Sequence, residues 1–544
     1  MSQPALQLTF LVPAAAHAGV LAELTKGQSA PERISLAAMY LDTADRHLAR
    51  EGLTWRLRRE GRRWIQTLQR ADGSLLAQQA HEAIRPDATP DASLHAGTQA
   101  GDQLLALLQQ AAEDGQAPSA RYRSELARTS RRVRSGGAVV NLSYDDGRLV
   151  AGAHSSRVRT LAFTLGGGDP KAMTALAQRW QKRFGLLLDP RRMGERGDWL
   201  AAGLAGVPVR KATRPAYPAS ADARQALGAV VDECLTQLLL NAFGLVEGDP
   251  AQRVDHVHQL RVGIRRLRSA LRCFEGWAPM PPDDLQTELR ALFSTLGQAR
   301  DSDVLDSGVA RSLARAGAPT LHFDPPGDSA EPAALVSAVA TQRQLLQWLA
   351  WRASLDTTLP GAVHGDEAVR MPSQQAAAEG DAMPAVDMPG PAVSAPAEPS
   401  SPAADDKADG GPAEPLDALA ARRLARWHKR IAADARQFAS LPEPVVHDLR
   451  KRIKRQRYAV EFLAPVLRRK PLQQYLQVLA EAQEGMGQLN DLYVARDRYT
   501  EALQTQPEAW FALGWLSAKI EEVRTATAPA LRRLARCKPP GGRR

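Results

Sequence analysis

The chain has 544 residues, enough for two or three domains, and 44% of them are apolar, which is ample for sizeable cores. Lysine and arginine number 70 against 60 acids, giving a formal charge of +10. The three cysteines lack metal-ligand spacing, which argues against a disulfide framework and favours a reducing compartment. No leader-like start and no apolar run of about 18 residues stands out, so we expect a cytoplasmic protein without a membrane span.

Residues 1–205 alternate short β-rich runs with turns and predict a mostly antiparallel α+β domain. The expected strands are 7–12, 53–58, 64–68, 138–144 and 158–165. Helical spacing occurs at 101–112 and 172–184. A turn-rich connector, 206–220, closes this domain.

From residue 221 onward, long amphipathic stretches predict helices, with one interruption at 356–415. That segment is rich in Ala, Pro, Asp and Ser, cannot supply a core, and predicts a disordered acidic linker. Its eleven acids against two basic residues give −9, which leaves +19 on the rest of the chain. We expect helical halves at 221–355 and 416–536, a basic tail at 537–544, and phosphate-rich partners.

Two of the expected helices carry stripes of cations. At about 100° per residue, the members of the first stripe fall within an arc of roughly 80°, beside an apolar face that should be buried. The first stripe is His258, Arg261, Arg265, Arg268 and Arg272, and the second is His447, Arg450, Lys454 and Arg457. Like charges at these spacings repel, so the stripes favour a polyanionic ligand over simple solvation of a helix face.

Each stripe opens with a histidine, His258 or His447, which either donates to phosphate or makes a structural hydrogen bond to a neighbouring helix. After each stripe follows a second related segment, 296–304 and 486–494. The constant register predicts duplicated bundles, whose packing could bring both stripes to one surface. In the first of these segments, Asp301 and Asp303 could form an acid–base site but are expected instead to orient stripe arginines or to cap a helix.

The motif His-x-x-Arg-Val-x-x-Arg-Arg-Leu-Arg, its second copy and Arg-Asp-x-Asp-Val make residues 221–536 resemble the CHAD family. The resemblance implies two four-helix bundles with a basic surface that binds inorganic polyphosphate. The residues it implicates are His258, Arg261, Arg265, Arg266, Arg268, Arg272 and Arg300 in the first half, and His447, Arg450, Lys451, Lys454, Arg455 and Arg457 in the second. Asn490 replaces the arginine seen at Arg300.

Residues 1–205 resemble a CYTH domain, a tunnel-like antiparallel β-barrel, through Tyr40-Leu-Asp-Thr and Leu53-Thr-Trp-Arg-Leu-Arg. The family's opening Glu-x-Glu-x-Lys reads here Ala5-Leu-Gln-Leu-Thr, and the late strand 159–165 has no acid. Asn141, Gln69 and Met193 replace further charged residues. Tunnel triphosphatases hold divalent ions with carboxylates, and because these carboxylates are missing here, hydrolysis should be lost. We therefore expect no cofactor, with magnesium needed only if the domain is active.

The remaining cationic positions of this domain are Arg56, Arg58, Arg121 and Arg123, which either bind an anion in the tunnel or are ordinary structural arginines. The favoured function is non-catalytic binding of inorganic polyphosphate or a similar polyanion, in the cytoplasm or on polyphosphate granules. The alternatives are a metal-dependent triphosphatase or polyphosphatase acting through the tunnel, and a nucleic-acid-binding protein. The third is disfavoured because aromatics make up only 5% of the chain and are absent from the stripe faces. The oligomeric state stays open.

Overall fold

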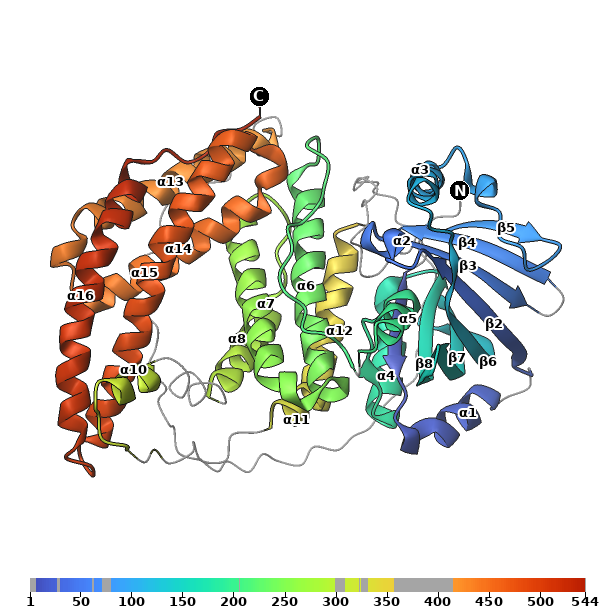
Figure 1. The fold of residues 1–544 in the computed structure, drawn as a ribbon. Helices are drawn as coiled ribbons and strands as arrows, with labels where there is room; N and C mark the ends of the chain where they lie inside the picture. The colour runs from blue at the N-terminus through green and yellow to red at the C-terminus, as the bar shows by residue number, and fades with distance from the viewer. Residues whose placement is uncertain are drawn as a thin grey trace, which may run out of the picture. The chain divides into compact units, whose positions relative to one another are not determined.

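The computed structural model describes residues 6–26, 30–60, 63–70, 80–204, 206–298, 309–321, 323, 331–356 and 414–543. In these ranges an antiparallel sheet with flanking helices is followed by helical bundles (Figure 1). The expected fold class, an α+β domain followed by an all-α region, is therefore confirmed. Nearly all of the expected acidic linker lies outside the described residues.

Nine strands form one antiparallel sheet in the described residues, in the order β5-β4-β3-β2-β6-β7-β8-β1-β9. The strands are β1 Gln7–Leu11, β2 Glu32–Asp42, β3 Leu53–Glu60, β4 Arg63–Arg70, β5 Ala80–Arg85, β6 Ser119–Ser135, β7 Ala138–Ala151, β8 His154–Gly167 and β9 Leu187–Leu188. The five expected strands are confirmed as β1, β3, β4, β7 and β8. Strands β2, β5, β6 and β9 are additional.

The two faces of the sheet differ in polarity, because successive side chains of a strand point to opposite sides. One face is apolar and is covered by α1 (His17–Thr25), α2 (His47–Arg50), α3 (Gln99–Glu113) and α4 (Pro170–Phe184). The other face meets α5 (Met193–Ala201) and carries many polar side chains; we call it the α5 face. The α5 face thus combines a small apolar cluster under α5 with polar side chains along the rest of the strands.

Two histidines meet beside β5. The Nδ1 atoms of His81 and His95 lie 2.8 Å apart, and Gln66 Nε2 lies 3.0 Å from Nε2 of the buried His95. Such a contact requires one neutral imidazole as acceptor. Burial and then the neighbouring His81 lower the pKa of His95 to about 4.

We expect this pair to make the N-terminal domain less stable in acid. An unfolded histidine takes up a proton near pH 6.5, whereas folded His95 does so only near pH 4. The contribution of His95 to the free energy of unfolding should therefore be fully present above about pH 6.5. It should fall by up to about 3 kcal/mol as the pH drops towards 4. Urea unfolding at pH 7 and pH 4.5 measures this loss. The His95→Asn variant should lose less stability between these two pH values than the wild-type protein. The control His154→Gln, at an exposed site, should lose as much as the wild type. Equal losses in the two variants would show that His95 is not the cause of the acid sensitivity.

The helical region begins with α6, and the connector before α6 is fixed to it. Its helices are α6 Ala223–Glu247, α7 Arg253–Phe274, α8 Asp283–Gln298, α10 Val309–Arg315, α11 Pro332–Ser337, α12 Val339–Ser354, α13 Leu416–Arg436, α14 Glu443–Phe462, α15 Arg469–Ala502 and α16 Ala509–Arg536. The side chain of Asn241 bonds both the N–H and the carbonyl of Arg210, at 3.2 and 2.8 Å. Thr213 donates its N–H to Glu233 at 2.6 Å. The segment 206–220 is thus bonded to α6 rather than being a free tether.

Helix α6 bears on the expectation that the chain has no membrane span. It is long and apolar enough to cross a membrane, and is the one such helix in the described part of the chain. However, 78% of its most apolar stretch is buried inside the protein. In addition, Asp232 in its middle accepts two hydrogen bonds from Arg352 of α12, at 2.9 and 2.7 Å. These features make α6 the central helix of a bundle.

The C-terminal tail also has a defined place. Arg543 donates its N–H to the carbonyl of Val466 at 3.1 Å, and Gly542 pairs with Leu467 in an antiparallel bridge. Residues 541–543 of the expected basic tail therefore pair with the turn that follows α14.

Candidate functional site

The helices that carry the two stripes, α7 and α14, pack against each other (Figure 1). Each buries the apolar side predicted from its sequence, and this burial fixes which side of the helix faces outward. The buried residues are Val257, Leu260, Ile264, Leu267 and Leu271 on α7 and Val446, Leu449, Ile453 and Val460 on α14. The two stripes thereby come from segments far apart in sequence to neighbouring helices.

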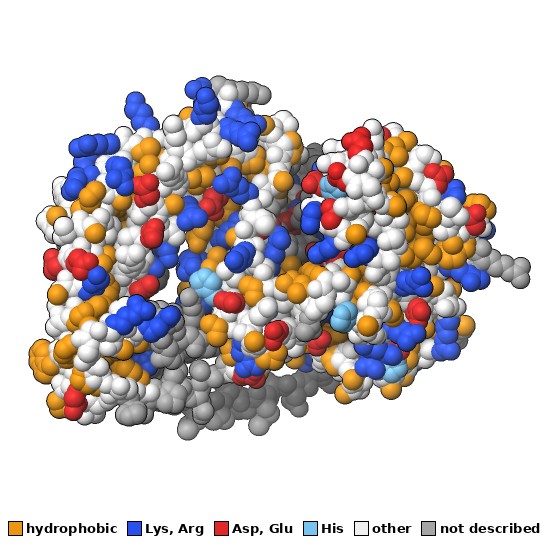
Figure 2. Space-filling model, viewed as in Figure 1, with side chains coloured by type: hydrophobic (Ala, Val, Ile, Leu, Met, Phe, Trp, Pro, Cys, Tyr) orange, Lys and Arg blue, Asp and Glu red, His pale blue; other side chains and the backbone are white. Residues whose placement is uncertain are grey.

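Cations of α7 and α14 lie close enough to repel each other. Burial lowers the pKa of Arg450, the carboxylate of Asp491 raises it, and the cation of Arg265 lowers it further, with a net decrease. Burial also lowers the pKa of Arg455, and the cations of Arg272, Arg452 and Arg268 add to that decrease. Positive charge therefore accumulates where α7 meets α14, and Figure 2 shows lysine and arginine side chains in this region.

Two stripe arginines are supported by an aromatic ring of α8. The Cζ atom of Arg261 lies 4.6 Å from the ring centroid of Phe293, and that of Arg268 lies 5.9 Å from it. Arg261 also donates to the carbonyl of Phe293 at 3.4 Å. These contacts hold long side chains in place and so reduce the entropy lost when they bind an anion.

The second-stripe histidine has a partner on the next helix. His447 is exposed and hydrogen bonds with Asn490 of α15. Burial of the ring and the cations of Lys451 and Arg450 lower the pKa of His447. The carboxylate of Asp491, next along α15, acts on Arg450, whereas Asp301 and Asp303, for which an orienting role is expected, lie outside the described residues. His258 of the first stripe is half-buried, and Arg300 lies outside the described residues.

The other predicted residues differ in how strongly protein carboxylates hold them. Lys451 is exposed and lies 3.7 Å from Asp448, and Lys454 is half-buried. Arg272 forms an exposed ion pair with Glu275 at 3.3 Å, and exposed ion pairs contribute little stability in water.

Arg457 is bonded to Glu461 at 3.0 Å and to the Gln483 side chain at 3.1 Å. Arg457 is therefore the stripe residue least available to a ligand.

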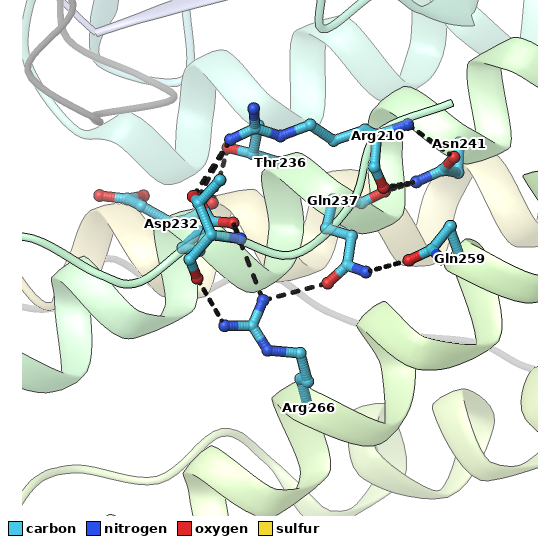
Figure 3. Close-up of polar contacts among 9 residues, drawn as sticks. Arg210, Asp232, Thr236, Gln237, Asn241, Gln259 and Arg266 are labelled. Atoms are coloured by element: carbon cyan, nitrogen blue, oxygen red, sulfur yellow. Dashed lines mark hydrogen bonds and ion pairs between the residues drawn. The ribbon is translucent and has the colours of Figure 1, made fainter. Parts of the chain in front are cut away.

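Arg266 is not a surface residue, which corrects its assignment to the binding set. It is 1% exposed and donates to Gln237 at 3.1 Å and to the carbonyl of Thr213 at 2.8 Å. Glu233 lies 3.7 Å away, and the ring centroid of Phe462 lies 5.5 Å away. Figure 3 shows Arg266 reaching from α7 into this polar network of α6 and the connector. Its role is to join these segments inside the protein.

The α5 face of the sheet bears the positions that replace the expected metal ligands. Gln7, Thr164, Asn141 and Arg132 are paired across four neighbouring strands and so share this face. Gln7 and Thr164 are within hydrogen-bonding distance, at 3.5 Å. Amides and hydroxyls therefore stand in this row where a hard cation would require carboxylates.

Three carboxylates of the α5 face are engaged by arginines. Arg128 holds both oxygens of Asp145, at 2.7 and 2.8 Å. Arg58 holds Glu60 at 2.7 Å and Glu82 at 2.9 Å. Within the described ranges, no three His, Cys, Asp or Glu side chains gather closely enough to hold a metal ion. Asp145, Glu60 and Glu82 are therefore already paired with cations of the protein.

The four predicted arginines of this domain do not form one cluster. Arg56 and Arg58 pair with Tyr40 and Ala38 and share the α5 face, as expected. Arg123 pairs with Met39 and lies on the opposite face, which corrects its inclusion. A register shift beside Arg121 separates it from Arg123.

On the α5 side, the charge of Arg121 acts on a carboxyl of α5. Burial raises the pKa of Asp198 to about 6, while the cations of Arg46 and Arg121 oppose that rise. The Nε atoms of Arg46, Arg56 and Arg121 are buried without a hydrogen-bond partner. This end of the α5 face therefore retains positive charge beside α5.

A comparison with protein-family models assigns the helical region. Residues 229–500, half of the 544-residue chain, match the CHAD domain model. The chain belongs to the CHAD family. No match was found among the curated proteins.

Solved structures similar to parts of this CHAD protein include the CHAD domain from the plant Ricinus communis. That structure is 26% identical, with a TM-score of 0.42, and the match covers 62% of this chain and all of that one. The N-terminal region is similar to a putative adenylyl cyclase from Hippeastrum, which is described as having a dominant triphosphatase activity. That structure is 14% identical, with a TM-score of 0.27, and the match covers 37% of this chain and 96% of that one. It is also similar to a putative adenylate cyclase from Bacillus halodurans. That structure is 15% identical, with a TM-score of 0.24, and the match covers 35% of this chain and 94% of that one.

The motif-based reading of the CHAD region missed the cations of α13. These residues recur at helical spacing on the exposed side of the helix. They are Arg422, Arg426, Lys429, Arg430 and Arg436. Trp427, which lies between them in the sequence, has its ring centroid 6.0 Å from Cζ of Arg455, so α13 adjoins α14 at one of the predicted binding residues. The sequence feature that could have identified these cations is the basic run Arg422-Arg-Leu-Ala-Arg-Trp-His-Lys-Arg.

Proposed function

We propose that this CHAD protein binds inorganic polyphosphate along α7 and α14 and does not hydrolyse it. The binding residues of this proposal are His258, Arg261, Arg265, Arg268, Arg272, His447, Arg450, Lys451, Lys454 and Arg455. Arg266 is left out because it is buried, and Arg457 because Glu461 holds it. Arg300 remains a predicted member from the sequence alone.

The observation that carries this proposal is the mutual repulsion of cations across α7 and α14. Burial is the largest cause of the lowered pKa of Arg450 and of Arg455, and the cation of Arg265 lowers the first further while those of Arg272 and Arg268 lower the second. Such an arrangement costs stability in the free protein and is relieved by a ligand of dense negative charge. Guanidinium groups engage two phosphate oxygens at once and remain charged at cellular pH.

The mechanism is multivalent neutralisation of charge. Each phosphate that meets an arginine or lysine releases counterions, so affinity should rise with chain length and fall steeply with salt. The absence of catalysis is supported by the α5 face, where Asp145, Glu60 and Glu82 are held by arginines. We place the protein in the cytoplasm, with polyphosphate granules as a site of association.

Binding and hydrolysis should be measured in the same samples. Full-length protein is titrated with long-chain polyphosphate at several salt concentrations, and phosphate release is followed with and without magnesium. Tight, salt-sensitive binding with no release is expected. Magnesium-dependent release would instead establish the triphosphatase alternative. Duplex DNA at equal phosphate concentration should compete poorly, and equal competition would favour the nucleic-acid alternative.

Helix α13 should extend the surface for long chains. Lys429→Glu together with Arg430→Glu is expected to weaken binding of long-chain polyphosphate by about tenfold, because two peripheral cations become anions. Tripolyphosphate has only three phosphates and is expected to bind on the stripes alone, so its affinity should not change. Calorimetric titration with both ligands measures the difference. A similar loss for both ligands would show that α13 acts through the fold and not by contact.

A further inference from the structure

A cavity of about 430 Å³ opens at the start of the second stripe, between the first turns of α14 and the C-terminal half of α15. We call it the α14–α15 pocket. Its lining residues are Glu443, Pro444, His447, Asn490, Tyr493, Val494 and Asp497. Cavities of roughly 300 to 1,000 Å³ with mostly apolar walls and a few polar groups are typical of small-molecule sites. His447 is the member shared with the stripe.

The charges of this pocket do not suit a phosphate. Arg496 donates to both oxygens of Glu443, at 2.8 and 2.9 Å, and to Asp497 at 2.7 Å. One guanidinium is thus shared by two carboxylates, and a further cation, Arg524, hydrogen bonds with Tyr493 in the wall. Partial burial and the neighbouring cations lower the pKa of His447 and so favour its uncharged form. The side of the pocket that carries Glu443 and Asp497 therefore disfavours an anion and offers acceptors to a neutral group that carries N–H donors, whereas His447 lies at the boundary with the cationic surface.

The remaining lining groups suit a flat polar ring. Val494 is 42% exposed and, with Pro444, supplies apolar wall. The amide of Asn490 is both donor and acceptor, and the imidazole of His447 adds a further polar contact. Tyr493 is 9% exposed, and the guanidinium of Arg496 lies 5.2 Å from its ring centroid, which fixes the tyrosine in the wall.

The pocket continues directly into the cationic surface. Arg450 and Lys451 lie three and four residues after His447, which is one turn of α14 or about 5 Å along the helix. Arg265 of α7 lies beside Arg450. A ligand with a neutral ring in the pocket could therefore place an attached phosphate chain on these cations.

We propose that the α14–α15 pocket holds the base of a nucleoside polyphosphate whose phosphates lie on Arg450, Lys451 and Arg265. The protein would then take nucleotides with a terminal phosphate chain as well as inorganic chains. The phosphate half of this inference rests on the proposed function, whereas the preference for a base rests on the pocket alone.

The test compares ATP with methyl triphosphate, which has the same phosphate chain and no nucleoside. Titrations of the full-length protein without magnesium should give at least tenfold tighter binding of ATP. Val494→Phe fills the pocket with an uncharged ring and should abolish this preference without changing the affinity for long-chain polyphosphate. Val339→Phe, the same change at an exposed helical valine of α12, should leave the preference intact.

Three results would overturn the inference. Equal affinity of the wild-type protein for ATP and methyl triphosphate would show that no base is recognised. A preference that survives in Val494→Phe would place the base elsewhere. Failure to bind ATP while long-chain polyphosphate binds would limit the surface to inorganic chains. If long-chain polyphosphate also fails to bind, the proposed function is wrong as well, and the two failures are thus distinguishable.

Discussion

Replacement of both Arg265 and Arg450 by glutamate is expected to weaken binding of long-chain polyphosphate by a factor of about 100 or more. These residues come from different helices, and the charge of Arg265 lowers the pKa of Arg450. A hydrogen bond between charged groups contributes about 1.5 to 3 kcal/mol, so the loss of two such contacts accounts for the expected factor. The reversed charges add repulsion. Each single variant should lose about tenfold.

The control for this experiment is a second double reversal of the same net charge. Lys171 and Lys182 are exposed on α4, outside the CHAD match. Their replacement by glutamate should change affinity only slightly and should leave the salt dependence almost intact, whereas the site variant should flatten it. If both double variants lose affinity equally, binding follows overall charge and α7 and α14 are not the site. If neither loses affinity, the proposed surface is wrong.

The stripes could be predicted from the sequence because they depend on periodicity within single helices. His258, Arg261 and Arg265 share an arc with each other, and the adjacent apolar side chains are buried as expected. The contact between α7 and α14 could only be suggested by the repeat, since it depends on how the two halves pack. The exposed cations of α13 were missed for the same reason, because they are brought near the site by the packing of α13 against α14, for example through Trp427 and Arg455.

Arg266 shows where the motif and the geometry disagree. One residue along a helix turns the side chain by about 100°, so Arg266 cannot share a face with Arg265. Its inclusion came from the family motif alone. Gln259, seven residues earlier and on the same side of α7, also bonds Gln237 of α6. The helical wheel was therefore sufficient to separate Arg266 from the stripe, although not to identify its partners.

In the N-terminal domain the sequence identified most strands but not their registers. Strand β6, Ser119–Ser135, was not predicted because its many arginines and serines interrupt the alternation of apolar and polar residues that is typical of a half-buried strand. The register shift beside Arg121 then separates two arginines whose spacing placed them together. Ion pairs such as Arg128 with Asp145 join different strands and have no local sequence signal.

Arg266→Met is expected to destabilise the helical region by about 3 kcal/mol or more while leaving polyphosphate affinity of the folded protein nearly unchanged. Removal of the guanidinium leaves the carbonyl of Thr213 and the side chain of Gln237 without their donor inside the protein. Lysine should not restore stability, because one ammonium cannot span the two acceptors that the planar guanidinium reaches. Urea unfolding followed by helical circular dichroism measures the loss.

The comparison is with Arg268→Met, two residues further along α7 and exposed. That variant should change stability by less than about 0.5 kcal/mol but weaken polyphosphate binding, which is the opposite pattern. The two neighbours would thus separate the structural from the binding function of one arginine-rich helix. A fully stable Arg266→Met protein with reduced affinity would reverse this assignment and return Arg266 to the surface that the motif implied.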